Sequence, residues 1–281
     1  MIMLSFRYLA IIACAALSVA TPARAQFPFD VPFVPTPQVV VDEMLRLANV
    51  GAGDFVIDLG SGDGRIAITA ARKFGARALG VDLDSHLIVQ SEESARQAAV
   101  EDRVKFLQQD LFKTDLSGAT VITMYLLPSV NRRLRPRLLE LRPGTRIVAH
   151  DFDLDDWKPD RKVTIRKNVF LWIVPAGVAG RWNTRLALPG GERTIELELR
   201  QRFQEIDGLA RAGGQIAAPL WEPRLRGDAI SFVVVDGEDR ENEASLYFEG
   251  RVNGGVMEGE VRRGVGSAQT RMTWRAVRVG S

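Results

Sequence analysis

The 281-residue sequence predicts an α/β protein in which a doubly wound sheet is followed by a small antiparallel β-barrel or sandwich. Three observations support this prediction. Short apolar runs alternate with amphipathic helical stretches up to about residue 150, as βαβ units require. A glycine-rich turn joins the first apolar run to a helix. After Val163 the pattern changes to short alternating segments separated by Gly, Asp and Asn turns.

Residues 1–25 differ from the rest of the chain. Arg7 precedes the apolar stretch Leu9–Leu17, and Ala23-Arg24-Ala25 forms an A-x-A cleavage site before Gln26. This pattern predicts a secretory signal peptide, because its apolar run is too short to span a bilayer comfortably. We therefore expect a mature chain in the periplasm or cell envelope, with an uncleaved membrane anchor as the alternative.

The charge of the mature chain is balanced. The sequence has 37 basic and 35 acidic residues, and cleavage after Ala25 would remove Arg7 and Arg24 but no acidic residue, leaving 35 of each. Without a clustered basic excess we expect no nucleic-acid partner. Cleavage would also remove the single cysteine, Cys14. The two histidines, His86 and His150, lie far apart in the sequence, so we expect no metal site.

The glycine-rich turn begins at Asp58 and runs Asp-Leu-Gly-Ser-Gly-Asp-Gly, between the apolar run Phe55–Ile57 and a helix starting at Arg65. Such a turn brings backbone N–H groups close to a nucleotide. A dinucleotide site is disfavoured because its last small residue is replaced by Arg65, and no Gly-Lys-Ser/Thr of a P-loop follows. The remaining pattern resembles motif I of class I S-adenosylmethionine (AdoMet) methyltransferases. A loop without ligand is the alternative.

An acidic first residue suits AdoMet, whose α-amino group and sulfonium are both cationic. The resemblance implies AdoMet as the cofactor. The predicted cofactor-binding residues at the turn are Asp58, Gly60, Ser61, Gly62 and Gly64.

Two further acids follow the next two predicted strands. Asp82 ends the strand Ala78–Asp82, where it is placed to accept hydrogen bonds from ribose hydroxyls. Asp84 competes for this role but is better suited to cap the helix that starts at Ser85. After the third strand, Val104–Leu107, Asp110 occupies the position at which class I methyltransferases commonly bind the adenine amino group. The alternative is a loop aspartate that caps the next turn.

The fourth predicted strand, Thr120–Leu126, and the fifth, Arg146–Ala149, end at the edge where open α/β sheets bind ligands. At this edge Tyr125 is expected to orient an acceptor, and His150 to orient it or take a proton, with an inert loop histidine as the alternative. Between the two strands we expect a basic helix broken by Pro136. Its arginines, Arg132, Arg133, Arg135 and Arg137, favour a solvated face over an anion site.

The segment before the first helix is rich in proline and aromatic residues. We expect it to pack on the domain, with Phe33 and Pro35 as an apolar lid over the acceptor. Thr36 is predicted to cap the first helix, with Pro37 at its first position. The other predicted acceptor-contacting residues are Leu126, Leu127 and Pro128.

Over about residues 27–175 the chain resembles bacterial class I methyltransferases akin to the mitochondrial lysine methyltransferases of the ATP synthase c-subunit and the adenine nucleotide translocase. The segments that carry the resemblance are Phe33–Pro37, Asp58–Arg65, Gly80–Asp82, Asp110–Phe112, Tyr125–Pro128 and Trp157–Asp160. The resemblance implies a Rossmann-like sheet and an AdoMet-dependent N-methyltransferase that acts on a protein lysine, with a membrane protein as one candidate acceptor. The competing interpretation is a non-catalytic envelope protein whose β-domain holds a partner or lipid.

The sequence thus predicts a signal peptide (1–25), a methyltransferase domain (26–175) and an antiparallel β-domain (176–281). Val163–Ile165 and Val169–Val174 are expected to finish the first sheet as its antiparallel edge. In the β-domain, Gly180-Arg181-Trp182 faintly resembles the Gly-x-Trp of lipocalins, but a packed core tryptophan is the favoured interpretation.

Overall fold

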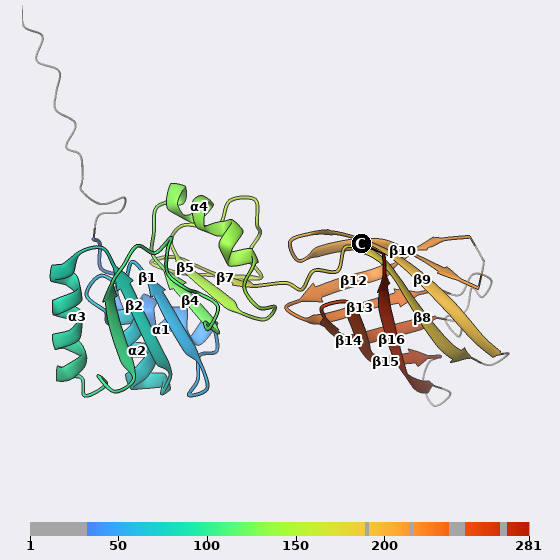
Figure 1. The fold of residues 1–281 in the computed structure, drawn as a ribbon, viewed down its shortest axis with the longest axis horizontal. Coiled ribbons are helices and arrows are strands. Elements are labelled where there is room, and N and C mark those ends of the chain that lie inside the picture. Colours follow the sequence, from blue (N-terminus) through green and yellow to red (C-terminus); the bar gives the residue numbers. More distant parts are fainter. Residues whose placement is uncertain (1–32, 189–190, 214–215, 236–244, 265–268, 281) are drawn as a thin grey trace, which may run out of the picture. The chain divides into compact units, whose positions relative to one another are not determined.

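The computed structural model describes residues 33–188, 191–213, 216–235, 245–264 and 269–280 (Figure 1). The predicted signal peptide and the segment 26–32 lie outside the described residues. None of the helices in the described ranges has the length and apolarity needed to cross a membrane.

The described part of the first domain is built on a seven-stranded sheet in the order β3-β2-β1-β4-β5-β7-β6. Its first five strands pair in parallel, and β7 and β6 form an antiparallel edge. This confirms the predicted doubly wound, Rossmann-like sheet and its edge. The bounds are β1 Phe55–Leu59, β2 Arg77–Asp82, β3 Val104–Gln108, β4 Val121–Met124, β5 Arg146–His150, β6 Arg161–Ile165 and β7 Lys167–Ile173.

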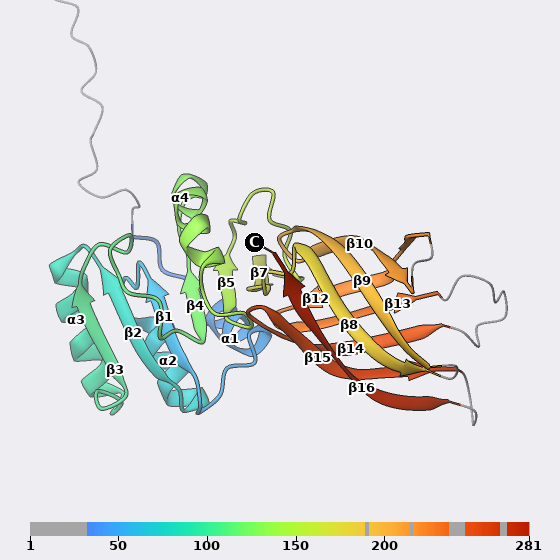
Figure 2. The ribbon, with the colours of Figure 1, turned by 45° about the vertical axis from the view of Figure 1, so that its right-hand side comes forward.

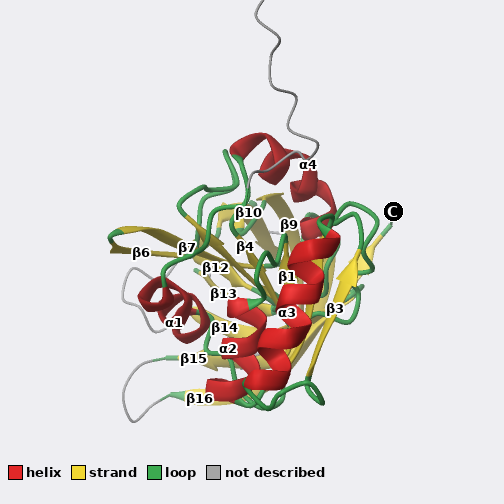
Figure 3. Ribbon diagram, turned by 90° about the vertical axis from the view of Figure 1, so that its left-hand side faces the viewer, coloured by secondary structure: helices red, strands yellow, loops and turns green. Residues whose placement is uncertain are grey.

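The strand order reverses between β1 and β4, which lie side by side with Leu59 opposite Met124. At such a switch point the connections after the two strands run in opposite directions, which opens a crevice at the carboxyl ends of the strands. Three helices, α1 (Gln38–Leu47), α2 (Arg65–Phe74) and α3 (Ser85–Gln97), pack next to one another along the sheet (Figure 3). Their buried apolar residues form one core with the inner strands.

Two helical predictions need correction. The first helix begins at Gln38, with Pro37 as its N-cap and no side-chain cap, so Thr36 does not cap it. The basic helix, α4 (Pro128–Leu139), is not broken by Pro136. A proline removes one intrahelical hydrogen bond, and here it lies in the last turn of a helix that buries Val130, Leu134 and Leu138 along one stripe.

The C-terminal domain forms one antiparallel sheet of nine strands within the described residues, in the order β11-β10-β9-β8-β16-β15-β14-β13-β12. The sheet curls into a nearly closed barrel (Figures 1 and 2). Where its ends meet, the Leu220 N–H donates to the Gly208 carbonyl at 2.9 Å and joins β10 to the chain before β12. The bounds are β8 Gly180–Leu188, β9 Gly191–Arg202, β10 Glu205–Ala212, β11 Ala218–Pro219, β12 Trp221–Arg226, β13 Ala229–Val234, β14 Leu246–Asn253, β15 Val256–Arg263 and β16 Thr270–Val279.

Alternating side chains fill the barrel. Along β8 every second residue is buried, beginning with Trp182, and the indole N–H of Trp182 donates to the Val178 carbonyl at 2.8 Å. Phe232, Phe248 and Trp274 pack as an aromatic cluster with ring centroids 4.7–5.9 Å apart. The barrel form of the prediction is therefore confirmed, with Trp182 in its core.

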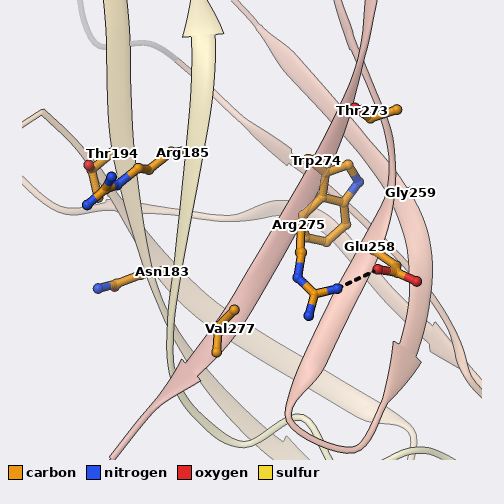
Figure 4. A pocket seen from close by; sticks show the side chains of 9 residues that line it. All are labelled: Asn183, Arg185, Thr194, Glu258, Gly259, Thr273, Trp274, Arg275 and Val277. Atoms are coloured by element: carbon orange, nitrogen blue, oxygen red, sulfur yellow. Dashed lines mark hydrogen bonds and ion pairs between the residues drawn. The ribbon is translucent and has the colours of Figure 1, made fainter.

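A pocket of about 800 Å³ opens between β8 and β16 (Figure 4). These strands pair only where Arg181–Thr184 meet Ala276–Val279, and beyond this register they part. On one wall Arg275 pairs with Glu258 at 3.0 Å. The described residues that line the pocket are Asn183, Arg185, Thr194, Glu258, Gly259, Thr273, Trp274, Arg275 and Val277, and they include none of the predicted site residues.

Candidate functional site

The glycine turn connects β1 to α2 with three glycines in the left-handed region: φ is 72° at Gly60, 55° at Gly62 and 77° at Gly64. Side chains from other parts of the domain also pack directly against each of these glycines. A Cβ on Gly62 would overlap the ring of Phe33, and one on Gly60 would lie 2.9 Å from Leu126 Cδ2. The sequence therefore needs glycine here for both conformation and space, and Phe33 and Leu126 border the turn.

Asp58, at the end of β1, is a buried carboxyl group with half of its hydrogen-bonding capacity unused. Oδ1 accepts a hydrogen bond from the Thr123 hydroxyl at 2.7 Å, whereas Oδ2 has no partner among the described residues. Burial, together with the charges of Asp82 and Asp63, raises the pKa of Asp58 to about 7 against the lowering effect of the Thr123 hydrogen bond. A cationic group beside Oδ2 would satisfy this oxygen and favour the ionised form.

Asp82 joins the end of β2 to the glycine turn. Its carboxylate accepts hydrogen bonds from the backbone N–H groups of Gly62, at 2.9 Å, and Asp84, at 3.0 Å. Asp84 caps α3 by accepting from the His86 N–H at 2.8 Å, as predicted. Ser61, within the turn, is buried, and its hydroxyl has no partner among the described residues. The turn therefore has one unpartnered hydroxyl, that of Ser61, and is linked to Asp82 through the Gly62 N–H.

Asp110 follows β3 in a tight turn. Its Oδ1 accepts from the Phe112 N–H at 2.9 Å, so the predicted alternative of a turn-capping aspartate is present in the structure. The preceding residue, Gln109, donates its N–H to the Asp82 carbonyl at 2.9 Å. Asp110 therefore lies at the same sheet edge as Asp82, but no contact joins its side chain to the glycine turn among the described residues.

The prediction of a solvated arginine face on α4 is wrong for two of its members. Arg137 donates to the backbone carbonyls of Leu111, Phe112 and Thr114 at 3.1, 2.6 and 2.6 Å. Arg135 donates to the Leu154 carbonyl at 3.1 Å. A planar guanidinium with five N–H donors can hold several carbonyls at once, so these side chains fix the loops after β3 and β5.

Tyr125 and His150 come together at the carboxyl ends of β4 and β5. Tyr125 is the first residue after β4, and its ring centroid lies 4.0 Å from that of His150. Phe152 also stacks on Tyr125, with the two ring centroids 6.2 Å apart. The sequence identified Tyr125 and His150 but not Phe152, because nothing in the pattern after β5 predicts how the chain folds back.

His150 is 2 % exposed and is the last residue of β5, so it is not a loop residue. Its Nδ1 lies 3.2 Å from the Thr36 hydroxyl, and its Nε2 has no partner among the described residues. Burial lowers the pKa of His150, the neighbouring Asp151 opposes this effect, and Lys167 reinforces it. The imidazole is therefore held neutral at neutral pH, with one nitrogen able to accept a proton.

The segment Phe33–Thr36 crosses the site as a strap. The Arg65 guanidinium donates to the Thr36 carbonyl at 2.9 Å and is itself held by Asp63, with Nε 2.9 Å from Oδ1. Thr36 thus anchors the strap at both Arg65 and His150, which replaces its predicted capping role. The Phe33 ring lies on the glycine turn and is 48 % exposed, so it can cover a ligand there.

The remaining predicted acceptor residues lie around this edge. Leu126 is buried against Gly60, Leu127 is half-buried at the N-cap of α4, and Pro128 is exposed at the first position of that helix. Pro35 is exposed on the strap. No group of three or more His, Cys, Asp or Glu side chains in the described ranges is placed to hold a metal ion.

The geometry fits an AdoMet site: a glycine turn, the free Asp58 oxygen for a cationic amino group and Asp82 beside the turn for a ribose. The family model of the ANTKMT methyltransferase domain matches residues 58–161. A protein-lysine N-methyltransferase from Saccharolobus islandicus is 40% identical over 151 residues, which cover 51% of this chain and 94% of that protein. The human lysine N-methyltransferase of the ATP synthase c-subunit is 33% identical over 149 residues, with 52% of this chain and 63% of the human protein covered.

Among solved structures, an RNA methyltransferase from Salinibacter ruber in complex with S-adenosyl-L-homocysteine is 52% identical. It matches with a TM-score of 0.51 over 52% of this chain and 96% of its own. From the match over nearly the whole archaeal protein and the geometry of the glycine turn, we conclude that this chain belongs to the ANTKMT-type family of class I AdoMet-dependent methyltransferases.

Proposed function

We propose that this AdoMet-dependent methyltransferase transfers the methyl group to the side-chain amine of a protein lysine at the edge formed by Tyr125 and His150. The observation that carries the proposal is the neutral, buried His150 with its free Nε2, packed against Tyr125 beside the glycine turn. The relatives named as lysine N-methyltransferases support the same acceptor class.

Each residue of the site has a distinct role in the proposed reaction. Bound AdoMet supplies an electrophilic methyl group on its sulfonium. Asp58 would hold its amino group, Asp82 its ribose hydroxyls, and Phe33 would exclude water from above the turn. An amine attacks only without its extra proton, so His150 Nε2 would take that proton while the Tyr125 hydroxyl orients the nitrogen. Thr36, through Nδ1, keeps the imidazole in place.

An RNA acceptor is the second candidate, because the Salinibacter ruber structure carries that name. The balanced charge of the chain without residues 1–25 favours a protein, since RNA binding depends on many phosphate contacts. The test is incubation with methyl-labelled AdoMet and either envelope proteins or total RNA. We expect protease-sensitive label that is recovered as methyl-lysine. Nuclease-sensitive label in place of it would refute the lysine acceptor.

Tyr125→Phe should lower kcat on the order of tenfold and leave AdoMet affinity unchanged. The substitution keeps the ring that packs on His150 and removes one hydrogen bond to the acceptor, a loss of roughly 1–1.5 kcal/mol. Turnover on labelled protein and AdoMet calorimetry separate the two effects. Tyr247→Phe on β14 makes the same chemical change in the barrel and should have no effect. Equal turnover in Tyr125→Phe and the parent would show that the acceptor does not depend on this hydroxyl.

We also infer that the protein is exported and acts in the periplasm or cell envelope, where a membrane protein is a suitable acceptor. The charged start, short apolar core and A-x-A site support this inference. Protein purified from its native cells should begin at Gln26 in an envelope fraction. N-terminal sequencing that finds Met1 in the cytosol would contradict export.

A further inference from the structure

An ion pair lies beside the proposed acceptor edge and has no part in the chemistry described above. Lys167, the first residue of β7, places its Nζ 2.9 Å from Asp151 Oδ2. Asp151 directly follows His150. The carboxylate is sheltered, with 15 % of its side chain exposed, whereas the lysine side chain is 59 % exposed. A primary ammonium from the surface thus reaches a sheltered carboxylate next to His150.

The backbone holds Asp151 in place without help from Lys167. Asp151 adopts a left-handed conformation with φ 64°, and its N–H donates to the Asn168 carbonyl at 2.7 Å. On the other side Asn131 Nδ2 donates to the carbonyls of Phe152 and Asp153 at 3.3 and 3.0 Å. The backbone that carries the carboxylate is therefore held by hydrogen bonds to β7 and α4.

The surroundings of the carboxylate suit an alkylammonium ion. The chain neighbours of Asp151, His150 and Phe152, both pack against the ring of Tyr125, with centroids 4.0 and 6.2 Å from it. A carboxylate forms a charge-assisted hydrogen bond with an ammonium, and aromatic faces favour a cation. The Nε2 of His150, buried and without a partner among the described residues, lies in the same group.

We propose that Asp151 is the docking group for the ammonium of the acceptor lysine, and that Lys167 occupies it as an internal competitor until an acceptor arrives. This inference rests on the proposed function. The acceptor displaces Lys167, forms the ion pair with Asp151 and is thereby placed beside Tyr125 and His150. Asp151 is a positioning residue, since His150 takes the proton. Displacement is easy because an ion pair with one exposed partner is weak.

Binding of n-butylamine to the full chain loaded with S-adenosylhomocysteine tests the proposal by titration calorimetry or NMR. Lys167→Met should tighten butylamine binding about two- to fivefold, the range expected for losing one weak competing ion pair. Asp151→Asn should weaken it, and asparagine tolerates the left-handed conformation of this position. In the double variant the gain from Lys167→Met should vanish, because both changes act through one carboxylate.

Two controls separate this effect from charge alone. Lys73→Met removes an ion pair with Asp42, 2.6 Å long, between α2 and α1, and should leave butylamine binding unchanged. Butanol, an uncharged probe, should not discriminate between the parent and Asp151→Asn. Unchanged butylamine affinity in Lys167→Met, or in folded Asp151→Asn, would overturn the proposal. Because no methyl transfer is measured, this outcome is distinct from finding the label in RNA, which would refute the lysine acceptor.

Discussion

Gly62→Val should reduce AdoMet affinity by about thirtyfold or more in a protein that still folds. Gly62 has φ 55°, a conformation that is costly for a β-branched residue, and its Cβ would overlap the ring of Phe33. Backbone strain and overpacking each cost roughly 1–3 kcal/mol. The turn can relieve both only by shifting the backbone N–H groups and Phe33, which border the cofactor site.

Titration calorimetry with AdoMet measures this loss, and circular dichroism checks the fold. Gly53→Val is the matched control, because a Cβ there meets nothing within 4 Å and φ is not positive. Its affinity should equal that of the parent. A folded Gly62→Val protein that binds AdoMet as tightly as the parent would show that the turn is not the cofactor site.

AdoMet affinity should fall as the pH decreases below about 7, the pKa to which burial raises Asp58 in the free protein. A cationic amino group beside Oδ2 stabilises the ionised carboxylate, so binding is coupled to loss of a proton. Calorimetry between pH 5.5 and 8 measures the slope. Asp58→Asn should bind weakly and lose this pH dependence. If its slope matched that of the parent, another group would be responsible.

Ionisation of Asp58 should have the opposite effect on the stability of the free protein, which should fall as the pH rises. The pKa of Asp58 is higher in the folded state, about 7, than its ordinary value of 3.8, so the folded state binds more protons between these limits. The free energy of unfolding should therefore decrease from about pH 4 to pH 7, by up to roughly 4 kcal/mol. Urea denaturation should show this decrease in the parent but not in Asp58→Asn.

The sequence predicted the part of the site that depends on local patterns. The glycine turn requires left-handed residues at three alternate positions, and strand order at a switch point places Tyr125 near that turn. Both follow from spacing along the chain. The structure confirms that β1 and β4 are neighbours and that Asp84, rather than Asp82, caps α3.

The contacts that sequence analysis missed join residues far apart in the chain. Thr36 has the composition of a helix cap, but its hydroxyl meets His150, 114 positions away. Arg137 belongs to a basic cluster that resembles a solvated face, yet it binds carbonyls of the loop after β3. No local pattern distinguishes these choices, since the partners are backbone atoms or side chains brought close only by the tertiary fold.

The sequence predicted an antiparallel β-domain but only some of its strands. The alternating pattern predicts strands over Thr194–Phe203, Ile230–Val235, Ser245–Val252 and Thr270–Val277, which correspond to β9, β13, β14 and β16. It did not predict β8, β10, β11, β12 and β15. Their exposed residues are mostly charged, so few apolar residues mark these segments as strands.

The non-catalytic interpretation of the whole protein finds no support, because the methyltransferase relatives and the intact glycine turn indicate an enzyme.

The most direct test of the proposed site is a crystal structure of the chain in complex with S-adenosylhomocysteine. We expect the ligand under the Phe33 strap, with its amino group toward Asp58, its ribose hydroxyls within hydrogen-bonding distance of Asp82 and its sulfur facing Tyr125 and His150. A ligand bound elsewhere, such as in the pocket between β8 and β16, or bound without contact to Asp58 and Asp82, would contradict the assignment of this edge as the site of methyl transfer.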